Sequence, residues 1–175
     1  MSKSIAVLVT DEFEDSEYWK PVDALRAAGY AIFNIEKAKD NVVKGKKDQS
    51  PVTIDLAIED AKVDDYAGLL IPGGHSPDGL RGDDRFAQFV KDFDATGKPI
   101  FTICHGPHLL ISAEVVKGRK MTSVKNIAID LKNAGALFED SAVVIDSNRL
   151  VTSRTPEDLG VFNDAMLKVL AAHKG

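Results

Sequence analysis

The chain has 175 residues, of which 44% are hydrophobic and 28% charged, and its formal net charge at pH 7 is −5. This length can bury one core without metals or disulfides, so we expect a single domain spanning residues 1–175. The apolar runs are far shorter than the roughly 18 residues that a membrane span requires, so no membrane partner is expected. The acidic balance argues against nucleic acid, and we interpret the basic KGKK segment at 44–47 as a solvated loop.

The N-terminal segment turns acidic after a short apolar run, so no secretory signal is expected. The single cysteine, Cys104, cannot form an internal disulfide, which favours a reducing cytoplasm. One cysteine and four scattered histidines offer no metal-ligand spacing. Neither the P-loop nor the dinucleotide glycine pattern is present, so we expect neither a metal nor a cofactor.

Short apolar runs alternate with amphipathic segments along the chain. In chain order, the pattern predicts a strand at 5–9, a helix at 16–28, a strand at 31–35, a small antiparallel excursion at 41–56, a strand at 68–71, a helix at 85–96, a strand at 100–103, helices at 108–113 and 127–134, a hairpin of 143–145 with 150–152, and a closing helix at 156–172. This alternation predicts an α/β fold, with a mostly parallel central sheet, helices on both faces and a small antiparallel hairpin. Ligands bind such sheets at the carboxyl ends of the strands, where this reading puts the loop at 72–82 and the segment that holds Cys104.

Cys104 lies where a predicted strand turns into a helix, in the segment IFTICHGPHLLIS. A sharp strand-to-helix turn of this kind is a nucleophile elbow, which exposes one side chain above the sheet. The first amides of the following helix would favour the thiolate over the thiol. The alternative is that Cys104 is a small apolar core residue, as free cysteines often are.

The neighbours of Cys104 suggest how the thiol could be used. His105 could serve as a base if the turn rotates its ring back toward the sulfur, or it could simply bond the backbone at the helix start. If the strands at 68–71 and 100–103 are neighbours, the amides of Gly74 and His105 could bind a developing oxyanion. A carboxyl group buried beside the thiol could donate a hydrogen bond to the sulfur, but the residues alone do not decide which acid it is. The candidates follow the first strand: Asp11, Glu12, Glu14, Asp15 and Glu17.

Four segments together resemble the PfpI family of intracellular cysteine proteins. They are TDEFEDSE, LLIPGGHSPDGLRGD, PIFTICHGPHLLISA and VVIDSNRLVTSRTPEDL, in the family's order and covering essentially the whole chain. The family belongs to the superfamily that includes the Parkinson-associated protein deglycase and the class I glutamine amidotransferase-like fold. The resemblance implies a flavodoxin-like three-layer sandwich.

The resemblance also implies roles for particular residues. Cys104 would be the nucleophile in a strained conformation, Glu14 the protonated carboxyl beside the sulfur, and His105 the base, with the amides of Gly74 and His105 as the oxyanion hole. Asp78 of a neighbouring subunit would orient the histidine, so the chain would act as a dimer or a higher ring. Peptidase-type members differ from this chain in having glutamate at the Asp78 position and a tyrosine at the Val124 position.

Three functional hypotheses follow. The first, which we favour, is a cofactor-independent cysteine enzyme of the stress response. Its substrate would be a reactive carbonyl, as in glyoxalases and protein deglycases, or a peptide. The second is a non-catalytic oxidation sensor or chaperone that uses the reactive Cys104. The third is a binding subunit with an inert cysteine.

Overall fold

The computed structural model describes residues 2–173. Its central sheet has seven strands in the order β10-β11-β7-β6-β1-β2-β5. All neighbouring strands are parallel except β10, which pairs antiparallel with β11 at one edge. The strands of this sheet are β1 (Ser4–Leu8), β2 (Ala31–Glu36), β5 (Leu56–Ala57), β6 (Gly68–Ile71), β7 (Ile100–Ile103), β10 (Val144–Asp146) and β11 (Leu150–Ser153).

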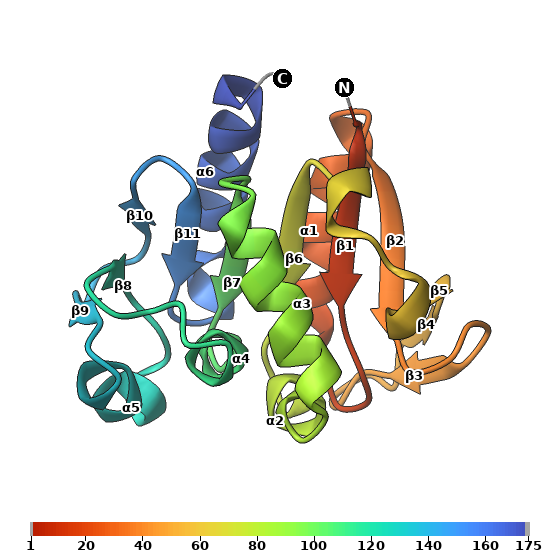
Figure 1. The fold of residues 1–175 in the computed structure, drawn as a ribbon, viewed down its shortest axis with the longest axis horizontal. Coiled ribbons are helices and arrows are strands. Elements are labelled where there is room, and N and C mark those ends of the chain that lie inside the picture. The colour runs from red at the N-terminus through yellow and green to blue at the C-terminus, as the bar shows by residue number, and fades with distance from the viewer. Residues whose placement is uncertain (1, 174–175) are drawn as a thin grey trace.

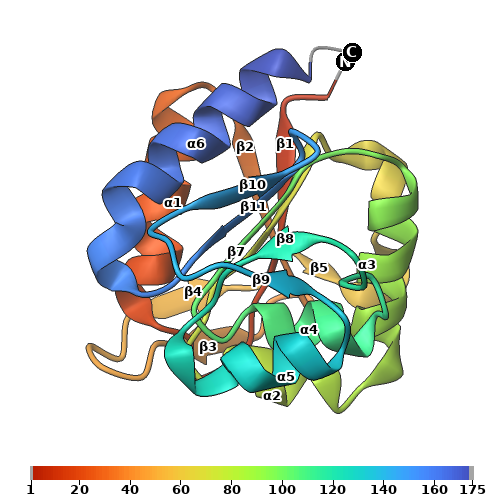
Figure 2. The ribbon, with the colours of Figure 1, turned by 90° about the vertical axis from the view of Figure 1, so that its left-hand side faces the viewer.

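Helices cover both faces of the sheet, as Figures 1 and 2 show. On one face lie α1 (Asp15–Ala27) and α6 (Leu159–Ala172), whose apolar side chains pack on strand residues such as Val7 and Phe101. On the other lie α2 (Ser76–Arg81), α3 (Asp84–Ala95), α4 (Pro107–Ser112) and α5 (Ala128–Asn133), over Leu8 and Leu69. Successive strand residues thus point to opposite cores, as the pleat of a strand requires. The predicted flavodoxin-like three-layer sandwich is confirmed.

Two small sheets stand apart from the central one. The antiparallel pair of β3 (Val42–Lys44) and β4 (Pro51–Thr53) confirms the predicted excursion. A short parallel pair, β8 (Lys120–Met121) with β9 (Leu137–Phe138), and strand β5 were not predicted. Helix α2 was also missed, because its sequence was interpreted as a loop.

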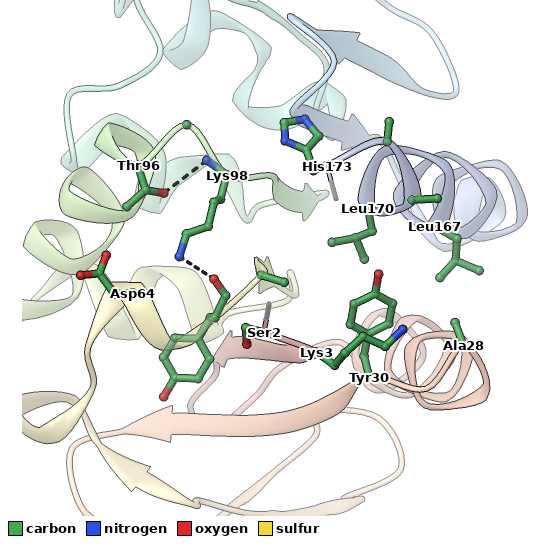
Figure 3. Close-up of a pocket in the computed structure, with 15 residues that line it drawn as sticks. Ser2, Lys3, Ala28, Tyr30, Asp64, Thr96, Lys98, Leu167, Leu170 and His173 are labelled. Atoms are coloured by element: carbon green, nitrogen blue, oxygen red, sulfur yellow. Dashed lines mark hydrogen bonds between the residues drawn. The ribbon is translucent and has the colours of Figure 1, made fainter. Parts of the chain in front are cut away.

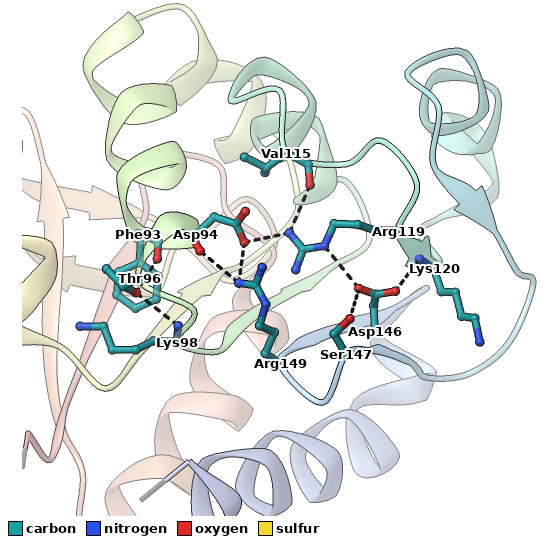
Figure 4. Close-up of polar contacts among 10 residues, drawn as sticks. All are labelled: Phe93, Asp94, Thr96, Lys98, Val115, Arg119, Lys120, Asp146, Ser147 and Arg149. Atoms are coloured by element: carbon teal, nitrogen blue, oxygen red, sulfur yellow. Dashed lines mark hydrogen bonds and ion pairs between the residues drawn. The ribbon is translucent and has the colours of Figure 1, made fainter. Parts of the chain in front are cut away.

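An ion-pair cluster fastens the β10–β11 hairpin to the end of α3 (Figure 4). The Asp94 carboxylate accepts hydrogen bonds from Arg119 at 2.8 Å and from Arg149 at 2.9 Å. Arg119 also contacts Asp146 at 3.4 Å, and its side chain is only 12% exposed. Charge-assisted bonds of this kind hold strand β11 in register next to β7, which leads to Cys104.

Two further findings concern the whole described chain. Between residues 2 and 173, no helix is long and apolar enough to cross a membrane. Over the same range, no group of three or more His, Cys, Asp or Glu side chains is arranged to hold a metal ion.

Candidate active site

Cys104 lies at the carboxyl end of β7, directly before α4, and adopts a left-handed backbone conformation with φ of 62°. A non-glycine residue adopts such a φ only when its surroundings enforce it. Here the Cys104 N–H donates to the carbonyl of Ser153 at 3.1 Å, and the Cys104 carbonyl accepts from the N–H of Val124 at 3.2 Å. Both sides of the elbow are therefore fixed by the backbone.

The turn needs glycine at Gly106. A Cβ at this position would collide with Oγ1 of Thr102 and lie 2.9 Å from the carbonyl oxygen of Ile71. The bare backbone lets α4 start immediately after the elbow, with Pro107 at its first position, where a missing N–H removes no helical hydrogen bond.

The left-handed turn brings the ring of His105 back over the sulfur. Nδ1 of His105 lies 3.3 Å from Sγ of Cys104, although adjacent side chains of a regular strand would point apart. Burial is the largest cause that lowers the pKa of His105, and the neighbouring charge of His108 adds to it. The imidazole is therefore neutral at pH 7 and can accept a proton.

The acid beside the sulfur is Glu17, which corrects the expectation for Glu14. Glu17 is 0% exposed, and its Oε1 accepts a hydrogen bond from the Gly73 N–H at 3.0 Å. Burial, with the charge of Glu14 next, raises the pKa of Glu17 to about 8, although hydrogen bonds from Gly73 and Cys104 oppose the rise. Glu17 is thus protonated at pH 7 and can donate to the sulfur.

Glu14 lies elsewhere for a geometric reason. It precedes α1, whereas Glu17 lies within the helix on the side that packs against the sheet. The two oxygens of Glu14 instead face the ammonium groups of Lys46, at 3.3 Å, and Lys47, at 3.0 Å. Neither lysine was among the predicted site residues.

Gly73 packs against both the acid and the thiol. A Cβ on Gly73 would lie 2.9 Å from Cβ of Cys104 and would collide with Oε1 of Glu17. The next residue, Gly74, has φ of 82°, and its backbone N–H bonds the sulfur together with the N–H of His105. The structure therefore brings both predicted oxyanion-hole amides to Cys104.

The expected low pKa of the thiol is not observed. Burial, followed by the charge of Glu17, raises the pKa of Cys104 to about 12, and the amides of His105 and Gly74 only partly offset this rise. Glu17 is protonated, and therefore uncharged, at pH 7, so burial is the main cause of the raised pKa of Cys104 at that pH. The resting pair is therefore a neutral thiol beside a neutral imidazole, which can pass the proton to His105 as the sulfur attacks.

Asp78 and Val124, the two positions that depart from the family pattern, lie differently in the structure. Asp78 is exposed in the first turn of α2. No residue between 2 and 173 of the same chain forms a hydrogen bond with Nε2 of His105, so that nitrogen is available to a group from outside. The Val124 N–H bonds the carbonyl of Cys104, so this position lies next to the backbone of the elbow.

A cavity of about 1000 Å³ lies at the opposite, amino-terminal edge of the sheet (Figure 3), and its wall contains none of the candidate site residues. Lys98 projects into it but donates to the carbonyls of Val63 and Tyr66, at 2.7 and 2.5 Å. Closer to the thiol, a cavity of about 440 Å³ is lined by His108, whose ring centre is 6.2 Å from that of His105.

Comparisons with known proteins show the family of the chain. The chain is 58% identical over 172 residues to protein/nucleic acid deglycase 2 of Escherichia coli, covering 98% of this chain and 100% of that protein. It is 51% identical over 170 residues to general stress protein 18 of Bacillus subtilis, covering 97% and 99%.

A solved two-domain protein from Anabaena variabilis, which contains DJ-1/ThiJ/PfpI-like and ferritin-like domains, superimposes with a TM-score of 0.94 at 32% identity. The match covers 97% of this chain and 48% of that one. Residues 3–169 match the sequence profile of the DJ-1/PfpI family. The chain belongs to the DJ-1/PfpI family.

Proposed function

We propose that this protein is a cysteine-dependent, cofactor-independent enzyme that acts on reactive dicarbonyls and their adducts, of the glyoxalase or deglycase type. The observation that carries the proposal is the 3.3 Å contact between Sγ of Cys104 and Nδ1 of a neutral His105 on a strained elbow. A core cysteine would need neither the histidine nor the strain. The 58% identity to a deglycase of Escherichia coli supports the same chemistry.

In the first step, Cys104 attacks the aldehyde carbon of a dicarbonyl such as methylglyoxal. The S–C bond forms, His105 takes the thiol proton, and the electron pair of the C=O bond moves to oxygen. The amides of Gly74 and His105 and the acid proton of Glu17 are the donors available to stabilise that oxygen. The oxygen then takes the proton back from His105, and the product is a hemithioacetal.

The second step is an internal redox reaction that needs no cofactor. A proton leaves the former aldehyde carbon, and one is added to the neighbouring carbonyl carbon, which gives a thioester of a 2-hydroxy acid. Water then hydrolyses the thioester, releasing lactate and regenerating the thiol. His105, which is neutral at pH 7, is the base in position for the proton transfers.

An adduct on an amine enters the same route. When the sulfur replaces the amine on the adduct carbon, the C–N bond breaks and the amine leaves with a proton, which again gives the hemithioacetal. The name of the Escherichia coli relative includes nucleic acids as well as proteins. That this chain does not bind nucleic acid stays a prediction.

We further propose that the site is completed by a second subunit, whose Asp78 orients His105. The exposed position of Asp78 on α2 and the open Nε2 of His105 support this arrangement. An assembly of at least two chains is required for it.

The test measures lactate formed from methylglyoxal by the wild type and by Cys104→Ala, His105→Gln and Glu17→Gln. We expect no turnover without the thiol, and at least about a hundredfold loss without the base. A second arm measures amine release from a methylglyoxal adduct of N-acetyllysine against its spontaneous rate. Acceleration of that release identifies a deglycase, whereas lactate formation alone identifies a glyoxalase. If the wild type and Cys104→Ala do not differ on either substrate or on a fluorogenic peptide, the enzymatic proposal fails.

One observation favours oxidation sensing as the second candidate. Oε2 of Glu17 is buried and has no well-aligned hydrogen-bond partner among residues 2–173, so it could bind an oxidised sulfur. The raised pKa of Cys104 disfavours oxidation, because the thiolate is the form that reacts with peroxide. Mass spectrometry after peroxide treatment distinguishes the two: a sensor would form sulfinate on Cys104 faster than a free thiol does.

A further inference from the structure

The segment that joins β3 to β4 contains Lys46 and Lys47 in an exposed turn, as expected for the KGKK sequence, and it is also tied to the start of α1. The Asp15 carboxylate accepts hydrogen bonds from the N–H of Lys47 at 2.9 Å and from the hydroxyl of Ser50 at 2.5 Å. The Lys46 N–H donates to the carbonyl of Phe13 at 2.9 Å, and Gly45 packs directly on Asp15. The two lysines are thus held in a defined place.

Their side chains place two ammonium groups beside Glu14, next to the candidate site. Both ammonium groups bond the carboxylate of Glu14, whose side chain is 7% exposed, while the side chains of Lys46 and Lys47 are 32% and 64% exposed. Glu14 shares its one negative charge between the two cations, and the Asp15 carboxylate lies against the backbone of Lys47. Glu157 also faces Lys47, but it is exposed and screened by water. The Lys46 side chain is partly exposed, so an incoming group can contact its ammonium group.

The backbone connects this charge to the thiol. Glu14, which anchors Lys46, donates its N–H to the Gly73 carbonyl at 3.1 Å, and Phe13 forms a bridge with Gly74. Gly73 and Gly74 are the residues that contact the acid and the sulfur.

The charge of Lys46 acts on all three titratable groups of the site. Burial dominates the pKa of each of them. Burial raises the pKa of Cys104 and of Glu17, and the charge of Lys46 opposes this rise. Burial lowers the pKa of His105, and the charge of Lys46 adds to this fall. The backbone geometry agrees, because the Lys46 N–H bonds Phe13, which bridges Gly74 beside the sulfur.

We propose that Lys46, assisted by Lys47, makes this site selective for carbonyl substrates that carry a carboxylate. An ammonium group preorganised by the fold attracts such a group without the cost of ordering a free side chain. The claim that the substrates are carbonyl compounds rests on the proposed function. The preference for a negatively charged reagent does not, because it can be measured on the thiol without turnover.

The experiment compares alkylation of Cys104, the only thiol of the chain, by iodoacetate and by iodoacetamide. In both reactions the sulfur displaces iodide and the thiol proton is lost, so the reagents differ mainly in charge. Any change in the thiolate fraction cancels in the ratio of the two rates. The reference is the same ratio for N-acetylcysteine amide, which carries no charge besides the thiolate, and rates are followed by intact mass at pH 7.5.

We expect the wild-type ratio of iodoacetate to iodoacetamide to exceed that of N-acetylcysteine amide, and to fall about fivefold in Lys46→Gln. Lys47→Gln should show a smaller fall, because that side chain is more exposed. Lys44→Gln, on the same hairpin, is the matched control and should keep the wild-type ratio. Added salt should lower the ratio in the wild type more than in Lys46→Gln.

A wild-type ratio equal to that of N-acetylcysteine amide and unchanged in Lys46→Gln would overturn the inference, whether or not the enzyme turns over methylglyoxal. An equal fall in Lys44→Gln would also overturn it, because it would show a general surface effect. Absence of turnover together with a Lys46-dependent ratio would refute the proposed function and support the charge selection.

Discussion

Replacing Glu17 with Gln tests whether the buried acid is protonated in the folded chain. Its pKa is raised from 4.5 to about 8, with burial as the main cause. Between these two values the folded chain holds a proton that the unfolded chain has released. Each pH unit in this window therefore costs the wild type about 1.4 kcal/mol of unfolding free energy. From pH 5 to pH 7.5 the loss amounts to about 3 kcal/mol. Gln has nearly the same shape and does not titrate, so the variant avoids this loss.

The assay is denaturant unfolding of both proteins at a series of pH values. Subtracting one free energy from the other removes the contributions of the groups that titrate alike in both. We expect the stability of Glu17→Gln relative to the wild type to rise by about 3 kcal/mol between pH 5 and pH 7.5 and to level off above pH 8. Glu12→Gln, at a carboxylate whose side chain is 66% exposed, is the control. A difference that stays constant across the window would mean that Glu17 is ionised when folded, and would refute the protonated acid.

Three other predictions concern the elbow and its assembly. The pKa of His105 is lowered by burial, so kcat/KM for methylglyoxal should start to fall only below pH 6.5 as the pH is lowered. A fall that begins at or above pH 6.5 would contradict a neutral base. Gly106→Ala should lower the unfolding free energy by about 1 to 3 kcal/mol, because its methyl group collides with Thr102; an unchanged denaturation midpoint would contradict this. Asp78→Asn should lower turnover about tenfold or more. If Asp78 acts across a dimer interface, mixing the Asp78→Asn and Cys104→Ala proteins should restore up to about a quarter of wild-type activity, because a mixed dimer contains one complete site. No recovery after subunit exchange would exclude that role.

The central sheet could be predicted because its strands are continuous apolar runs, and a parallel sheet buried on both faces imposes such runs. The elements that were missed carry no such signal. Helix α2 has six residues that include a proline and a glycine, and only tertiary packing, such as the buried Leu80, holds it. The strands β5, β8 and β9 have two residues each, too few for any periodicity to show.

The candidate site was predictable where the chemistry is local. Cys104, His105 and Gly74 follow from a strand, a turn and a glycine pair in the sequence. The acid beside the sulfur, Glu17, was not predicted, because five carboxylates follow the first strand and the resemblance pointed to Glu14. A helical signal for Glu17 does exist: it lies four residues before Pro21 and eight before Leu25, both on the buried side of α1. The raised pKa of Cys104 could not be predicted, since burial at the elbow depends on packing by segments distant in sequence.

The bare backbone at Gly73 has a consequence for how this protein can vary. Thiol and acid sit on either side of a single residue that has no room for even one carbon atom more. That residue reacts with nothing, yet any side chain there would push the two reactive groups apart. A complete substitution scan should therefore find position 73 as intolerant as position 104, and the reason at position 73 would be volume alone.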